Sequence, residues 1–244
     1  MDGWHAQVMT HERRGPDVAV FTCRTPVPLP FHAGQHVSIE CPYRPWQSRS
    51  YAMANAPRPD GVLEFHVRAA APAGVADALV RRLKPGDMLR LSEPHGTVAL
   101  DPFSRRDIVF VAGGTGLAPA KALIDELSRF NRTRWIHLFR GERRRSDFYD
   151  REGVDNLTRR HPWLSVTRAT SDEPDEQGDR ATVADLVARH GPWPDHDFYV
   201  FGSPPTVEAT LRRLELMGVA AARIRYGTYA INSEFDAGQK IRQV

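Results

Sequence analysis

VFVAGGTGLAP, residues 109–119, joins an apolar run to a cluster of glycines and then to helix-forming residues. Glycine tolerates positive φ and lets a backbone approach a ligand closely. Amides at the start of the following helix would bind phosphate. Gly113, Gly114, Thr115 and Gly116 therefore form a candidate phosphate loop, although a tight strand-to-helix turn explains the same residues equally well.

From Asp107 onward, short apolar runs alternate with longer amphipathic runs. This alternation predicts a parallel sheet with helices on both faces. Ligands bind such sheets at the carboxyl ends of the strands, where Gly113–Gly116 and Gly202–Pro205 both fall. The predicted strands are Ile108–Ala112, Trp135–Phe139, Leu164–Ala169, Phe198–Phe201 and Arg223–Tyr226, and the predicted helices are Ala118–Phe130, Phe148–Arg159, Val183–Ala188 and Thr206–Met217.

The first hundred residues contain short β-type runs separated by prolines and other turn residues. Closely spaced short strands of this kind predict an antiparallel barrel. The predicted strands are Val18–Cys23, His36–Glu40, Ser50–Ala54, Val62–Val67 and Met88–Ser92, with one helix over Ala76–Leu83. We therefore predict two domains, residues 1–102 and 103–244.

Composition narrows the functional class. The 244 residues are 41% hydrophobic and 26% charged, with a net charge of +3 that is spread along the chain, so a nucleic-acid partner is not expected. No apolar run reaches the roughly 20 residues of a membrane span, and residues 1–14 lack a signal core, so we expect a cytoplasmic protein without membrane attachment. Cys23 and Cys41 are expected to be free thiols, too few for a four-thiolate iron–sulfur cluster, and no metal site is predicted.

A second informative segment is Arg49-Ser50-Tyr51-Ala52. An arginine can pair with a phosphate bidentately, and a tyrosine one residue further can cover the face of a flat ring. The alternative is a surface arginine beside a half-buried strand tyrosine.

With Arg49–Ala52 preceding Val109–Pro119 in the chain, the two segments resemble the ferredoxin-NADP reductase superfamily. The resemblance is closest to the reductase half of bacterial flavohaemoglobins and to oxygenase reductase components. Matching turns at Gly34-Gln35, Ala54–Pro57, Lys84–Asp87 and Pro94–Gly96 extend the resemblance through almost the whole chain. It implies an N-terminal antiparallel flavin-binding barrel followed by a Rossmann-like, parallel-sheet NAD(P)H domain. FAD is implied in preference to FMN.

The resemblance also implies cofactor-binding residues. For the flavin these are Arg49, Ser50, Tyr51, Ala52, His66, Val67, Arg68, Gly74, Val75, Ala76 and, against the other ring face, Tyr229. For the dinucleotide they are Gly113, Gly114, Thr115, Gly116, Arg140, Arg143, Asp172, Phe201 and Gly202. Tyr229 is equally well explained as a surface residue, and Phe201 as a residue that fills the core.

Three positions depart from the family pattern. Ala52 and Ala76 stand where relatives carry serine, and Phe201 stands where they carry cysteine beside the nicotinamide. We therefore expect hydride transfer to be real but slow. The donor is either NADH or NADPH: the Arg143–Arg145 cluster favours a 2′-phosphate, unless it is a solvated charge run, whereas Asp172 favours a free 2′-hydroxyl. The balance favours NADH slightly.

The function that this pattern indicates is a flavin-dependent NAD(P)H oxidoreductase. A hydride would pass from nicotinamide to flavin, and electrons would leave to a separate acceptor such as an oxygenase, a haem protein or a small molecule. No side-chain acid or base is required, so no catalytic residue is named. Two alternatives remain open, namely a flavin-binding interaction or sensory module that has lost nicotinamide turnover, and a nucleotide-binding protein without flavin. The sequence does not indicate the oligomeric state.

Overall fold

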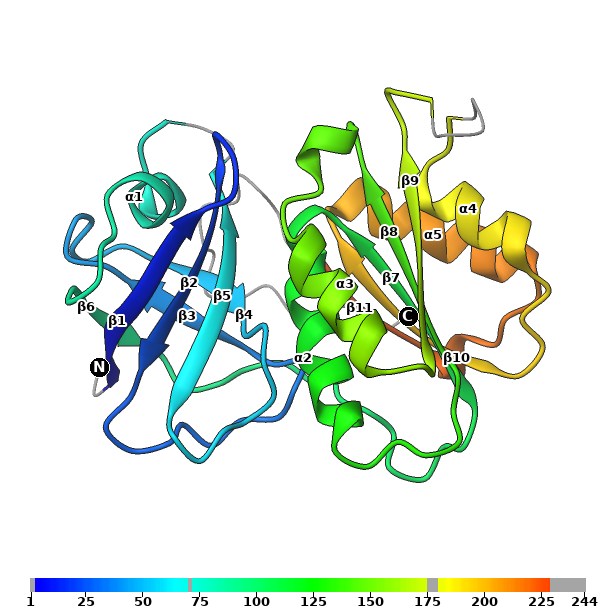
Figure 1. Ribbon diagram of the computed structural model, residues 1–244, viewed down its shortest axis with the longest axis horizontal. Helices are drawn as coiled ribbons and strands as arrows, with labels where there is room; N and C mark the ends of the chain where they lie inside the picture. Colours follow the sequence, from blue (N-terminus) through cyan, green and yellow to red (C-terminus); the bar gives the residue numbers. More distant parts are fainter. Residues whose placement is uncertain (1–2, 70–71, 175–179, 229–244) are drawn as a thin grey trace. The chain divides into compact units, whose positions relative to one another are not determined.

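The computed structural model describes residues 3–69, 72–174 and 180–228. Within these residues the chain forms two compact units (Figure 1). The first unit contains the residues up to Leu100 together with Lys121–Arg129, and the second contains Asp101–Ala120 and the residues from Phe130 onward.

The first unit is built on an antiparallel sheet with the strand order β4-β3-β6-β1-β2-β5. An antiparallel bridge between Met53 and Phe65, and a 2.8 Å bond from the Ala54 amide to the Glu64 carbonyl, bring the two edges of the sheet together. This near-barrel confirms the predicted fold of the N-terminal half. Its elements are β1 (Trp4–Arg13), β2 (Val18–Arg24), β3 (His36–Glu40), β4 (Ser48–Ala52), β5 (Val62–Arg68), α1 (Val75–Arg81) and β6 (Met88–Leu91).

Strand β1 was not predicted. Its ten residues, WHAQVMTHER, include only two fully buried side chains, Ala6 and Val8. The remaining residues are polar or partly exposed, so the apolar alternation that marks a half-buried strand is too short to recognise. The strand is held by its pairing with β2 and β6 on either side.

The second unit is built on a parallel sheet with the strand order β11-β10-β7-β8-β9. Helix α3 lies along one face and α4 and α5 along the other (Figure 1). This arrangement confirms the predicted parallel sheet. The elements are β7 (Asp107–Gly113), β8 (Ile136–Glu142), α3 (Arg151–Arg160), β9 (Leu164–Thr170), α4 (Val183–His190), β10 (His196–Gly202), α5 (Pro204–Leu216) and β11 (Ile224–Thr228), with short 3₁₀ turns at Gly114–Gly116, Arg145–Asp147 and Ala221–Arg223. Helix α2 (Leu117–Ser128) begins in this unit, and its residues from Lys121 onward belong to the first.

The central strands β7 and β10 are apolar along their length because both faces of the sheet are covered. On one face, Val109, Val111 and Val200 pack in the same apolar cluster as residues of α4 and α5. On the other, Phe110 lies 5.3 Å from Tyr199 between ring centroids. Among the described residues, no helix combines the length and apolar character needed to cross a membrane.

Replacing Phe110 by alanine tests this packing. Phe110 is fully buried, so we expect Phe110→Ala to lower the free energy of unfolding by about 3–5 kcal/mol through lost contacts and a residual cavity. Phe103 in the same unit is 89% exposed, and Phe103→Ala should change it by no more than about 0.5 kcal/mol. Urea unfolding followed by circular dichroism compares the two, and equal losses would contradict the burial described here.

Candidate functional site

The carboxyl ends of β7 and β10 meet at three glycines. A Cβ added to Gly116 would lie 2.5 Å from the carbonyl oxygen of Phe201, and one added to Gly113 would lie 2.9 Å from Cγ2 of Thr206. A Cβ on Gly202 would lie 3.6 Å from Cα of Gly113, so the two strand ends are neighbours. Gly114 has a φ of 56°, which favours glycine. The two loops predicted to bind a dinucleotide therefore come together, and only glycine fits their closest approach.

Thr206 is a part of this edge that the sequence analysis did not single out. Its methyl group packs against Gly113 and Gly202, and its Oγ1 lies 2.9 Å from Oγ of Ser203. Pro204 and Pro205 open α5, which places Thr206 in the first turn of that helix. The run GSPPT, residues 202–206, could have placed Thr206 in the first turn of a helix. Only the pairing of β7 with β10 shows that its side chain contacts Gly113 as well as Gly202.

Arg143 and Asp172 lie next to each other where β8 and β9 end. The arginine predicted NADPH as the electron donor, whereas the aspartate predicted NADH. The amide of Asp172 donates to the carbonyl of Arg143 at 2.9 Å, and the amide of Ser171 donates to the carbonyl of Glu142 at 3.1 Å. The side chains of Arg143 and Asp172 are both exposed. Either charge can therefore face a ligand at this point of the edge.

The backbone amides of Arg144 and Arg145 donate to neighbouring carboxylates, and the Arg145 guanidinium donates to a backbone carbonyl. The Arg145 amide donates to Glu173 Oε2 at 2.9 Å, and its guanidinium donates to the Pro174 carbonyl at 2.8 Å. The Arg144 amide donates to Asp147 at 3.1 Å. These contacts fold the segment after β8 into its 3₁₀ turn and leave Arg143 as the residue of the cluster next to Asp172.

Arg140 is buried, with only 1% of its surface exposed. Its guanidinium lies 5.1 Å from the ring centroid of Phe148 and 5.6 Å from that of Tyr149, and Nη2 is 3.7 Å from Oε1 of Glu142. Burial lowers the pKa of this guanidinium. Arg140 was predicted to lie near the ribose, but its side chain points into the interior, so Arg143 is the exposed arginine at this edge.

Phe201 is also fully buried. Its main chain pairs with Ala112 on one side and Gly227 on the other. This burial agrees with the alternative that Phe201 fills the core, and its carbonyl is the group that Gly116 approaches. Tyr229 lies outside the described residues.

In the first unit, Arg49 and Tyr51 lie on one face of β4. They pair with Ile39 and Val37 of β3, so their side chains share the face that carries the barrel core. Tyr51 is half-buried there, and burial raises the pKa of its hydroxyl above the usual value. In the described part of the chain, the one hydrogen bond of the Arg49 guanidinium goes to the Ser48 carbonyl at 3.0 Å. The remaining N–H groups are available for an anion.

The opposite face of β4 carries Ser50 and Ala52. Ser50 Oγ lies 3.3 Å from Oγ of Ser38, and Ala52 pairs with His36. Burial lowers the pKa of His36, and the neighbouring charge of His95 lowers it further. The side chains of His36, Ser38 and Ser50 form a polar row on this face, and a serine hydroxyl in place of Ala52 would extend it.

The predicted phosphate strand β5 alternates in the same way. Val67 points into the barrel core, so only its backbone could contact a ligand. His66 is buried, and its Nε2 lies 2.8 Å from Oε1 of Glu64. Burial alone raises the pKa of Glu64, but the His66 hydrogen bond and the charge of Lys121 outweigh it and hold that pKa at about 2. Arg68 Nε lies 3.7 Å from Oδ2 of Asp17.

The start of α1, where Gly74, Val75 and Ala76 were predicted to contact a phosphate, has no side-chain cap within the described part of the chain. Gly74 has a φ of 121°, and no atom lies within 4 Å of a Cβ built there. Among the described residues, no side chain hydrogen-bonds to cap the first amides of this helix. Val75 is buried in the core and Ala76 packs against it, so neither side chain supplies a donor and any contact would come from backbone amides.

The residues present therefore fit the flavin and dinucleotide that the sequence predicted. Arg49 offers free guanidinium donors beside the half-exposed ring of Tyr51. Gly113, Gly116 and Gly202, at the carboxyl ends of β7 and β10, offer backbone without side chains. Each of these features is matched to a flat, negatively charged ligand rather than to an apolar one.

Two family descriptions match the chain. Residues 5–100 match the oxidoreductase FAD-binding domain, and residues 110–212 match the oxidoreductase NAD-binding domain. The reductase component 1 of terephthalate 1,2-dioxygenase from Comamonas sp. is 33% identical over 230 residues, covering 92% of this chain and 68% of the relative. The chain belongs to the ferredoxin reductase family.

Other relatives in this family are longer than the part they share with the chain. The reductase component of phenol 2-monooxygenase from Pseudomonas sp. strain CF600 is 33% identical over 77% of this chain but only 54% of its own length. The chain thus spans between 54% and 68% of these two relatives. Among solved structures, the Amycolatopsis cytochrome P450 reductase superposes with a TM-score of 0.85 at 29% identity, covering 93% of this chain and 69% of that one. The flavohaemoglobin-like FAD/NAD-binding domain from Vibrio cholerae, with a TM-score of 0.82 at 20% identity over 94% of this chain and 100% of that one, shares the fold.

The exposed donors of Arg49 lead to a first prediction for this site. Removing a charge-assisted contact costs about 1.5–3 kcal/mol, so Arg49→Ala should bind flavin at least about tenfold more weakly while the fold is retained. Arg90→Ala is the matched control, because Arg90 is a partly exposed arginine on β6 of the same sheet. Flavin titration of the apoprotein measures both. Unchanged affinity in Arg49→Ala/Tyr51→Ala would place the flavin elsewhere.

The contact between Arg143 and Asp172 leads to a second prediction. Asp172→Arg should improve the use of NADPH relative to NADH, because it removes a charge that repels a 2′-phosphate and adds a donor. The ratio of kcat/KM for the two donors measures the change, and Arg145→Ala is the control because Arg145 is engaged by Glu173 and Pro174. A wild-type protein that already prefers NADPH by about tenfold, a difference of 1.4 kcal/mol, would instead assign the ribose contact to Arg143.

Proposed function

We propose that the chain is a flavin-dependent NAD(P)H reductase that passes electrons to a separate acceptor. Residues 1–102 would hold the flavin and residues 103–244 the nicotinamide donor. The observation that carries the proposal is the match of the chain to FAD-binding and NAD-binding oxidoreductase domains in series, on a fold whose strand ends converge on glycine. The relatives named above are reductase components, so an oxygenase or another electron carrier is the proposed acceptor.

Bound flavin would supply the hydride-accepting chemistry, and the protein's residues would hold and orient its partners. Arg49 would neutralise a flavin phosphate, and the open part of the Tyr51 ring would cover one face of the flavin ring. Gly113, Gly116 and Gly202 would let the dinucleotide lie against bare backbone. These residues bind and orient, and none of them is assigned a proton transfer. The cytoplasmic location stays a prediction.

A visible spectrum of the purified protein tests the proposal. A bound flavin absorbs in the blue and near ultraviolet, and anaerobic addition of NADH or NADPH should bleach those bands. Bands that persist with both donors would favour a flavin-binding module without nicotinamide turnover. A protein that takes up no flavin from solution would contradict the proposal altogether.

Ala52 lacks the hydroxyl that the resemblance implies at this position, so the rate of flavin reduction tests whether that hydroxyl is needed. We expect slow bleaching in the wild type, because small misplacements of the reacting groups can cost up to ~100-fold in rate. Ala52→Ser should accelerate it, because it restores the serine that the family resemblance implies beside the reacting end of the flavin. Stopped-flow absorbance measures the reductive half-reaction. If the serine variant is no faster, the alanine is compensated and alignment at this position does not limit the rate.

A further inference from the structure

Arg140 is a buried cation near the carboxyl end of β8. Only 1% of its surface is exposed, and among the described residues neither Nη1 nor Nη2 has a hydrogen-bond partner. Its ion pair with Oε1 of Glu142 spans 3.7 Å, which is longer than a hydrogen bond. A buried charge that lacks hydrogen bonds lowers the stability of a fold. A reason other than stability is therefore needed for an arginine at this position.

The guanidinium of Arg140 lies against two aromatic rings. Its Cζ is 5.1 Å from the ring centroid of Phe148 and 5.6 Å from that of Tyr149, and both rings are buried. The preceding residue, Phe139, packs with residues of α4 and α5, so alternation directs Arg140 to the opposite face of the sheet, where α3 lies (Figure 1). A cation attracts the face of an aromatic ring most strongly where water is excluded. Arg140 therefore fixes the place of Phe148 and Tyr149.

The segment between β8 and α3 forms a 3₁₀ turn with internal hydrogen bonds. The Arg144 amide donates to Oδ2 of Asp147 at 3.1 Å, and the Asp147 amide donates to the Arg144 carbonyl at 3.1 Å. The Phe148 amide donates to the Arg145 carbonyl at 3.4 Å. Because these bonds make the turn compact, a displacement of Phe148 would be passed along it to Arg143.

The start of the same segment is bonded to the end of β9. The Asp172 amide donates to the Arg143 carbonyl at 2.9 Å, and the Ser171 amide donates to the Glu142 carbonyl at 3.1 Å. The side chains of Arg143 and Asp172 are exposed and carry opposite charges. A change in the backbone position of Arg143 would therefore move Asp172 as well.

We propose that Arg140 is a positioning residue for the binding of the electron donor. Through Phe148 and the 3₁₀ turn, it holds Arg143 and Asp172 where their charges discriminate between a 2′-hydroxyl and a 2′-phosphate on the adenosine ribose. Because its guanidinium is buried, Arg140 acts through these residues and does not contact the nucleotide. A buried charge kept at a cost to stability then serves conformational specificity. The inference rests on the proposed function, because it takes the donor to be NADH or NADPH.

Titration calorimetry of the flavin-loaded protein with adenosine 2′,5′-bisphosphate and with 5′-AMP tests the inference without turnover. The ratio of the two dissociation constants measures the discrimination. Arg140→Met replaces the guanidinium with an unbranched apolar side chain. It should bring the ratio closer to one by about threefold or more, because residues that share contacts are energetically coupled. Phe148→Leu removes the ring but keeps an apolar side chain, so it should act in the same direction and replaces Arg140→Met if that variant does not fold.

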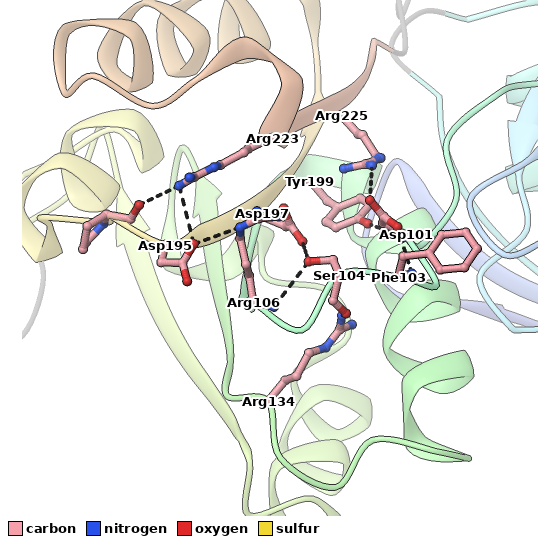
Figure 2. A network of polar contacts seen from close by, with 11 residues as sticks. Asp101, Phe103, Ser104, Arg106, Arg134, Asp195, Asp197, Tyr199, Arg223 and Arg225 are labelled. Atoms are coloured by element: carbon pink, nitrogen blue, oxygen red, sulfur yellow. Dashed lines mark hydrogen bonds and ion pairs between the residues drawn. The ribbon is translucent and has the colours of Figure 1, made fainter.

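Arg134→Met is the matched control. Arg134 is also a buried arginine of the second unit, but it precedes β8 and donates to the Ser104 carbonyl at 2.9 Å (Figure 2). Its replacement should lower the free energy of unfolding and leave the ratio unchanged. A double-mutant comparison separates positioning from a general effect on packing. In Arg143→Ala/Asp172→Asn, which removes both charges, adding Arg140→Met should change the ratio by less than about twofold.

Three results would overturn the inference. The first is a ratio that Arg140→Met and Phe148→Leu leave unchanged, and the second is an effect of Arg140→Met that is as large in Arg143→Ala/Asp172→Asn as in the wild type. The third is a wild-type ratio within about threefold of one, which would leave no discrimination to explain. Failure of the proposed function gives a different result: the wild type would bind neither nucleotide and NADH would not bleach its flavin, which would overturn both. Nucleotide binding with an unchanged ratio would overturn the inference alone.

Discussion

The contact between Gly116 and the Phe201 carbonyl is the constraint on which the second unit depends. A Cβ at Gly116 would lie 2.5 Å from that oxygen, and no side-chain rotation relieves a clash with backbone. The close approach seats the 3₁₀ turn Gly114–Gly116 directly on the end of β10 and so fixes where α2 begins. Helix α5 then brings Thr206 against Gly113 and Gly202. A strand edge free of side chains and a tightly packed helix start are therefore products of one backbone-to-backbone contact.

The first unit obeys a different constraint, the alternation of side chains along a strand. Arg49 and Tyr51 share a face of β4 because they are two residues apart, and Ser50 and Ala52 occupy the other. The same rule sends Val67 of β5 into the core and places His66 on the opposite face, together with Glu64, to which it is hydrogen-bonded. Alternation thus decides which side chains of each strand lie on the face of the barrel core and which lie on the other face.

These rules explain which predictions from the sequence were confirmed. The barrel, the parallel sheet and the meeting of the Gly113 and Gly202 loops follow from local patterns and from the rule that parallel strands end at one edge. The missed strand β1 shows the limit, since a mostly exposed strand is recognised only by its pairing partners. The burial of Arg140 against Phe148 and Tyr149 could not be predicted from the sequence either. A charged residue at the end of a predicted strand is expected to be exposed. The cofactor roles of individual residues rest on resemblance and remain predictions.

The contacts of Asp101 have a consequence for how such units are joined in evolution. Asp101 accepts from the Phe103 amide and, at 3.2 Å, from Arg225 of the last described strand, and the Asp101 amide approaches the Tyr199 hydroxyl at 3.3 Å (Figure 2). The residues that look like a connector are therefore part of the fold that follows them. A gene fusion or fragment that breaks the chain after Asp101 would leave Arg225 without this carboxylate. A junction between Leu100 and Asp101 would instead keep Asp101 with the unit whose residues it contacts.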